Sequence, residues 1–184
     1  GVLREARRAF PDRWSDLQPL PFRFATWVGY DMDGRTDIKW YHSIGFRLAE
    51  KAQRLERYAA SLKAIDSGHD LAGNLSRAAD EARARAEDFG SDLTEPEALS
   101  AAANRLTADH PDKLTSLVPI IEALEEEAED AATDRAIALK TLAAAMRADG
   151  LGMGWIHFRV NASQLHNAIR RRIDPDNTLD LASQ

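Results

Sequence analysis

Asp31 and Asp33 form an acidic pair beside a glycine in the turn "DMDG", directly after an aromatic run. Carboxylates at alternate positions are typical of calcium loops, in which a glycine occupies position six and a glutamate position twelve. With Gly34 at position six, positions one and twelve are Gly29 and Trp40, which carry no carboxylate. The spacing therefore excludes a calcium loop and favours a polar turn between a strand and a helix.

Arg159 is the second candidate functional residue, because it ends a strand-like run shortly before a helix that Ser163 can cap. In barrel and open-sheet enzymes, anions and substrates bind where the end of a strand faces the N-terminus of a helix. A guanidinium at that place can hold phosphate or carboxylate through two parallel hydrogen bonds. An ion pair with Asp31 or Asp33 is an equal alternative from periodicity alone.

The remaining polar clusters favour structural roles. The histidines have no ligand spacing, so they predict no metal site; they are His42, His69, His110, His157 and His166. The acidic run Glu125 to Glu127 is typical of a solvated helix face. The basic run Arg170 to Arg172 suits the C-terminal end of a helix, where the helix dipole favours positive charge.

Composition limits the class of protein. The 184 residues suit one ordinary domain, and 44% hydrophobic with 29% charged residues is a globular composition. A net charge of -6 argues against a nucleic-acid surface. The absence of cysteine excludes disulfides and suits a reducing cytoplasm. We find neither an apolar run of membrane-spanning length nor a signal peptide, so we expect no membrane association and a cytoplasmic location.

The chain is predicted to be mainly α-helical, with long helices inserted between two short strands. Residues 22–29 and 154–160 have the aromatic and β-branched content of strands, and the first run has the weak alternation of a strand buried on both faces. Residues 38–149 form the helical insertion, and residues 163–172 a last helix. Since two short strands make no stable sheet alone, they either pair with each other or belong to a larger sheet.

Within the insertion, apolar periodicity predicts helices from Trp40 to Ala64, capped by Asp37, and from Leu71 to Phe89, joined by a turn at 66–70. Thr94 and Glu97 form a capping box for a helix that ends near Ala108. A segment from Leu114 to Leu124 carries Pro119 as a kink. A further helix runs from about Ala131 to Ala148, and glycines end it.

Two segments resemble a known family. The run from Arg23 to Thr36 resembles the phosphoenolpyruvate carboxylase segment usually written F-x-S-W-x-G-G-D-R-D-G-N-P. The matching residues are Trp27, Gly29, Asp31, Asp33 and Gly34, whereas Tyr30, Met32, Arg35 and Thr36 differ from the pattern. The run from Trp155 to Arg170 is similar to the family's second motif, D-I-R-Q-[ED]-S, through Arg159 and Ser163.

The resemblance implies a TIM-type (β/α) barrel, of which the two strands here would be neighbours. It implies carboxylation of phosphoenolpyruvate with bicarbonate, giving oxaloacetate and phosphate, with Mg²⁺ held by residues outside this chain. Arg159 would bind the substrate phosphate and Trp27 would wall the pocket. Gly29, Asp31, Asp33 and Gly34 would shape the loop at the barrel rim.

The resemblance covers only an internal part of the family's polypeptide, and the start at Gly1 without methionine agrees. We therefore expect residues 1–184 to be one internal fragment, inactive alone, of a full-length protein that is a homo-oligomer. One alternative is a non-catalytic helical interaction module, built on the hairpin of the two long helices. The other is a paralogue that kept the fold and lost the activity.

Overall fold

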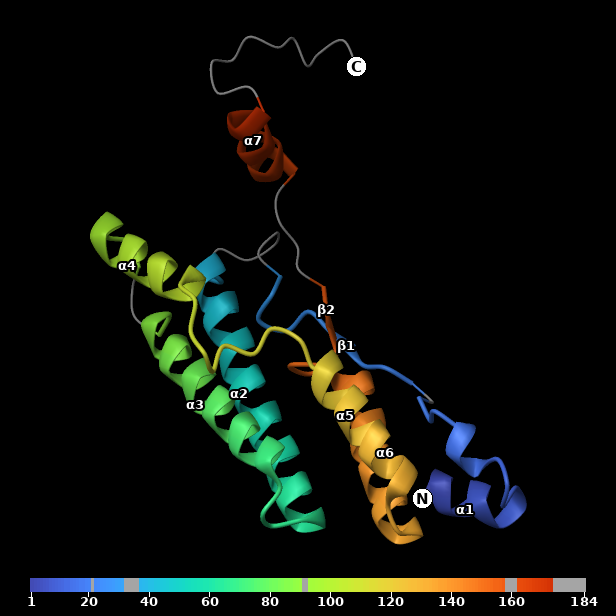
Figure 1. Cartoon of the computed structure of the whole chain (residues 1–184). Coiled ribbons are helices and arrows are strands. Elements are labelled where there is room, and N and C mark those ends of the chain that lie inside the picture. The colour runs from blue at the N-terminus through green and yellow to red at the C-terminus, as the bar shows by residue number, and fades with distance from the viewer. Residues whose placement is uncertain (21, 32–36, 91–92, 158–161, 174–184) are drawn as a thin grey trace.

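The computed structural model of the chain describes residues 1–20, 22–31, 37–90, 93–157 and 162–173, and two helical hairpins form its body (Figure 1). Helices α2 (Trp40–Ile65) and α3 (Asp70–Asp88) make the first hairpin, joined by the turn predicted at 66–70. Helices α5 (Val118–Asp130) and α6 (Thr133–Asp149) make the second. The structure thus confirms a mainly helical fold.

Shorter elements surround the two hairpins. Helix α1 (Val2–Ala9) lies beside α6 and leads into a short 3₁₀ helix, η1 (Trp14–Asp16). Helix α4 (Pro96–Thr107) follows the first hairpin, and α7 (Ala162–Ile173) stands apart from both hairpins (Figure 1). Among the described residues, no helix is at once long enough and apolar enough to cross a membrane.

The strands β1 (Ala25–Thr26) and β2 (Trp155–Ile156) pair in parallel, with Ala25 opposite Trp155. The Trp155 N–H donates to the Phe24 carbonyl at 3.0 Å, and the His157 N–H donates to the Thr26 carbonyl at 2.9 Å. The described residues show that the two strands pair with each other across the helices, as one of the two arrangements left open by the sequence requires; membership of a larger sheet stays a prediction.

The strands are shorter and far more exposed than predicted. Only two residues of each run belong to the ladder, and the expected burial on both faces is wrong: Phe24 is 61% and Val28 77% exposed. The physical reason is that a strand is buried only by what packs on its faces, and alternation in the sequence cannot report which neighbours are present. Within the described residues, each strand has one partner strand.

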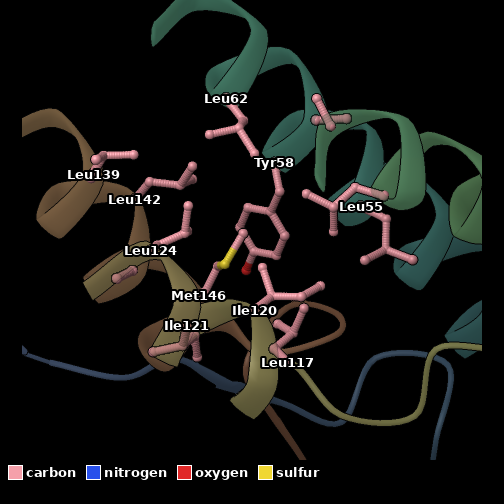
Figure 2. Close-up of a cluster of buried hydrophobic side chains, with 14 of the residues drawn as sticks. Leu55, Tyr58, Leu62, Leu117, Ile120, Ile121, Leu124, Leu139, Leu142 and Met146 are labelled. Carbon is pink, nitrogen blue, oxygen red and sulfur yellow. The ribbon is translucent and has the colours of Figure 1, made fainter. Parts of the chain in front are cut away.

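The main core lies between the two hairpins (Figure 2). Leucines of α2 and α3 meet the apolar stripes of α5 and α6, and Tyr58 and Met146 fill the space between them. A smaller cluster packs the start of α2 against the end of α3 and against α4; its buried members are Tyr41, Phe89, Leu93 and Ala102. Burial of this apolar surface is what holds the hairpins together, since helix propensity alone is weak.

Two predicted helix starts and one predicted kink are corrected. Lys39, not Asp37, is the N-cap residue of α2, and its N–H donates to His42 Nδ1 at 3.4 Å. Glu95, not Thr94, precedes α4. Pro119 sits in the first turn of α5 and produces no kink, because its missing N–H needs no partner there. Local cap patterns locate a helix start only to within a residue or two.

The acidic run of α5 is not simply a solvated face. Glu125 accepts two hydrogen bonds from Arg147 of α6, one of them 2.6 Å long. Glu127 accepts from Arg135 and lies 2.7 Å from His69 Nε2, at the turn between α2 and α3. These partly buried ion pairs join α5 to α6 and both hairpins to each other.

The Arg147–Glu125 pair predicts a pH-dependent contribution to stability. Hydrogen bonds from Arg147 hold the pKa of Glu125 below its ordinary value. A carboxyl with a lowered folded-state pKa stabilises the fold above its unfolded-state pKa and loses this contribution as pH falls through the folded-state pKa. We expect Arg147→Met to lower the free energy of unfolding by about 1 kcal/mol at pH 7 and by much less at pH 3.

Urea unfolding at the two pH values measures this difference. Arg57→Met, at an exposed position of α2, is the control and should change the free energy of unfolding little at either pH. An equal cost of Arg147→Met at pH 7 and pH 3 would show that the ion pair is not the source of the stabilisation.

Candidate functional site

The candidate site begins with a four-residue turn directly after β1. The Tyr30 N–H donates to the Trp27 carbonyl at 2.9 Å, and Gly29, the third residue, has φ +83°. A turn with positive φ at its third position requires glycine or asparagine. A Cβ on Gly29 would also lie only 2.9 Å from Cδ2 of Phe46. Glycine therefore permits both the turn and its close approach to α2.

Helix α2 holds this turn from one side. Ser43 Oγ donates to the Gly29 carbonyl at 2.6 Å, and the Tyr30 hydroxyl donates to Glu50 Oε2 at 2.9 Å. Arg47 Nη1 donates to the same Glu50 oxygen at 3.2 Å. Ser43 and Tyr30 are each 1% exposed. The turn is thus fixed by hydrogen bonds largely shielded from water, which makes their loss costly.

The same helix holds the loop that enters β2. Arg54 donates to the Gly152 carbonyl at 2.9 Å and to the Asp149 carboxylate at 2.7 Å. The Tyr58 hydroxyl donates to the Gly150 carbonyl at 2.9 Å. Burial raises the pKa of Tyr58, so this hydroxyl stays protonated and able to donate. One helix therefore positions the segments on which both strands depend.

Five polar side chains of α2 hold the turn after β1 and the loop before β2, and none of them is among the site residues predicted from the sequence. Ser43, Arg47, Glu50, Arg54 and Tyr58 recur at the spacing of one helix face. A polar stripe beside an apolar one within a single long helix was the available signal. Charged residues on a helix are ordinarily solvated, so such a stripe does not by itself distinguish a contact face from a solvent-exposed face.

Tyr30→Phe tests how much the turn depends on this face. Burial, followed by the adjacent Glu50, raises the pKa of Tyr30, so the hydroxyl donates throughout the neutral range. Since hydrogen bonds to charged groups contribute more than neutral ones, we expect the variant to lose about 2 kcal/mol of unfolding free energy. Urea unfolding with an unchanged m-value measures the loss.

A double-mutant cycle with Glu50→Gln supplies the control. The Tyr30→Phe substitution should lower the free energy of unfolding by clearly less in the Glu50→Gln background than in the wild type. Equal costs in the two backgrounds would mean that the hydroxyl contributes through some contact other than Glu50.

The predicted site residues fall into two groups. Trp27 is the first residue of the turn and is 55% exposed, Gly29 is its third residue, and Asp31 follows half-buried. Asp33, Gly34 and Arg159 lie outside the described residues. The structure therefore brings Trp27, Gly29 and Asp31 together beside β2, and the grouping of Arg159 with them stays a prediction.

The segment that leads into β1, at the opposite end of the strand from the turn, is aromatic and cationic. The Arg23 guanidinium lies 5.8 Å from the centroid of the Trp155 ring, so the segment before β1 also contacts β2 through a cation–π interaction. The Phe22 and Phe24 rings meet edge to face with centroids 5.2 Å apart. Phe22 and Phe24 line a cavity beside α1 and α6 and not the turn after β1. They do not supply an acid, a base or a nucleophile.

Within the described ranges, no group of three or more His, Cys, Asp or Glu side chains is placed to hold a metal ion. No protein-family model, curated protein or solved structure matches the chain. The case for a function therefore depends on the two motifs and on the geometry of the strands that carry them.

Proposed function

We propose that this chain is part of a phosphoenolpyruvate carboxylase-like enzyme, which carboxylates phosphoenolpyruvate with bicarbonate to give oxaloacetate and phosphate. The observation that supports the proposal is the parallel pairing of β1 and β2. The first matching run contains β1 and the second begins with β2, and parallel strands end at the same edge of a sheet. The two runs, far apart in the sequence, therefore share a pair of neighbouring parallel strands.

In a barrel, the edge at which parallel strands end is the one that carries the active site. The turn from Trp27 to Tyr30 leaves β1 at this edge, and His157 leaves β2 next to it. Arg159 follows His157 by two residues in the sequence. We propose that Arg159 binds the substrate phosphate, where a fixed guanidinium stabilises charge that develops during phosphoryl transfer. Trp27 walls the same pocket.

The part of the chain that the structure describes does not supply the Mg²⁺ site that such an enzyme needs. Asp31 lies at the edge, but the described residues bring no second and third ligand beside it. Magnesium is usually held by one or two carboxylates together with water and substrate phosphates. We assign the metal ligands to other parts of the enzyme and derive no step through the ion. The role of this chain is to bind and orient the substrate.

The proposal is tested in the full-length protein that contains this chain. Phosphate release from phosphoenolpyruvate is measured with and without bicarbonate and Mg²⁺, and we expect it to require both. Arg159→Ala should raise KM and lower kcat/KM by about a hundredfold or more, as expected when a charged partner of the substrate is removed. Arg159→Lys keeps the charge but not the bidentate geometry, so it should recover part of the loss.

Two results would overturn the proposal. Unchanged kinetics of Arg159→Ala in an active enzyme would remove Arg159 from the phosphate site. A well-folded full-length protein that releases no phosphate would favour a paralogue that kept the fold and lost the activity.

A further inference from the structure

An apolar groove lies between α1, α6, the end of α2 and the segment that leads into β1, on the far side of β1 from the turn that follows this strand. Its volume is about 770 Å³. Ile137, Thr141 and Ala145 of α6 form the floor, Val2 belongs to one wall, and Phe22 and Phe24 belong to the other. Helix α6 borders the groove from Asp134 to Asp149, which is about 22 Å at 1.5 Å per residue. Figure 1 shows α1 lying beside α6.

One end of the groove is cationic. Arg4 lines it and also lines an adjoining cavity of about 330 Å³, together with Arg7 and Arg8. These arginines share one face of α1, and Asp134 is the acid that borders the same cavity. Arg8 has a 3.6 Å contact with Glu5, in which both side chains are strongly exposed, so it is only weakly compensated. At the opposite end, Asp149 is neutralised by Arg54 at 2.7 Å.

We propose that this groove binds an acidic amphipathic helix of a partner protein. An apolar face of about four turns matches the length of α6 along the floor. Acidic residues at one end of that face would meet Arg4 and Arg7. The proposal concerns a surface separate from the strand ends and does not depend on the carboxylase reaction.

The exposure of the walls favours a helix over a thin ligand such as an acyl chain. Val2 is 59%, Phe22 63% and Phe24 61% exposed. A thin chain covers little of these side chains, whereas the apolar face of an amphipathic helix presents several side chains that can cover them. Covering exposed aromatic and aliphatic rims is the main source of affinity in helix-in-groove recognition.

The test uses the chain of 184 residues and a fluorescein-labelled, hydrocarbon-stapled peptide of roughly four helical turns. The peptide carries leucines on one face and glutamates on the flanks, and a matched peptide carries lysines in place of the glutamates. Fluorescence anisotropy should show saturable binding of the glutamate peptide, weakened by salt, and much weaker binding of the lysine peptide.

Three variants locate the site. Arg4→Glu/Arg7→Glu should lower the affinity for the glutamate peptide by about tenfold or more and raise the affinity for the lysine peptide. Ala145→Trp fills the floor and should abolish binding of both peptides. Ala103→Trp, at an exposed position of α4, is the matched control and should bind like the wild type. Circular dichroism and thermal melting establish that each variant is folded.

The proposal is overturned if the wild type shows no saturable binding, or if the two peptides bind equally. It is also overturned if folded Ala145→Trp binds like the wild type. If the peptide does not bind, and sedimentation shows a dimer that Ala145→Trp dissociates, then the groove is covered by a second copy of the chain. If only the acyl probe dansylaminoundecanoic acid binds, the occupant is a lipid-like molecule.

Discussion

Gly154→Ala is expected to separate the two strands and to lower the free energy of unfolding by roughly 3 kcal/mol. Gly154 has φ +78°, which side chains with a Cβ rarely adopt, and its Cβ would lie 2.6 Å from the Phe24 carbonyl oxygen. That oxygen accepts a hydrogen bond from the Trp155 N–H, and this is the first hydrogen bond between the two strands. The added methyl must therefore displace backbone, since no flexible side chain can yield instead.

Amide hydrogen exchange and urea unfolding together measure this effect. The N–H groups of Trp155 and His157 should lose protection, while those in the middle of α2 and α3 keep it. Gly73→Ala is the control. Gly73 lies inside α3, and its added Cβ would make only an ordinary 3.6 Å contact with Arg77. This variant should raise the free energy of unfolding by about 0.5–1 kcal/mol. If Gly154→Ala keeps wild-type stability and protection, the close approach of the two strands is wrong.

Arg85→Met is expected to lower the free energy of unfolding by about 3–5 kcal/mol and to release α4 from the first hairpin. Arg85 is 6% exposed and pairs with Glu81 one turn earlier in α3. It also donates to the carbonyls of Leu106, at 2.5 Å, and Ala108, at 3.1 Å, at the end of α4. The variant therefore leaves the buried Glu81 carboxylate without its counter-ion and removes hydrogen bonds that hold the end of α4.

The partner substitution shows whether the charge is responsible. In Arg85→Met/Glu81→Leu both charges are gone, and since apolar replacements of buried ion pairs are often neutral, much of the stability should return. Arg83→Met removes an exposed arginine with ion pairs to Asp80 and Glu56, and it should cost at most about 1 kcal/mol. If the double variant is as unstable as Arg85→Met, the lost contacts to α4 outweigh the unpaired charge.

The two long helices of the first hairpin, α4 and α6 could be predicted from the sequence to within a few residues, because their determinants are local, whereas α5 begins and ends later than the predicted segment from Leu114 to Leu124. Apolar side chains at helical spacing, such as Leu55, Leu62 and Leu75, mark faces that are buried in the structure. Gly150 was expected near the end of α6, and it is the C-cap residue there, with φ +62°. The two extended segments were also placed correctly, although their lengths and burial were not.

Contacts between distant residues were not accessible in this way. The polar stripe of α2 does not indicate which segment it contacts, so the sequence does not show that Ser43 and Glu50 hold the turn after β1, or that Arg85 reaches the end of α4. Each of these side chains would be solvated on an isolated helix, and it becomes buried only because another element packs against it. The sequence therefore determined the helices, the hairpin turn and the motifs. Only the tertiary structure decided which polar groups are buried and paired, because burial depends on neighbours that lie far away along the chain.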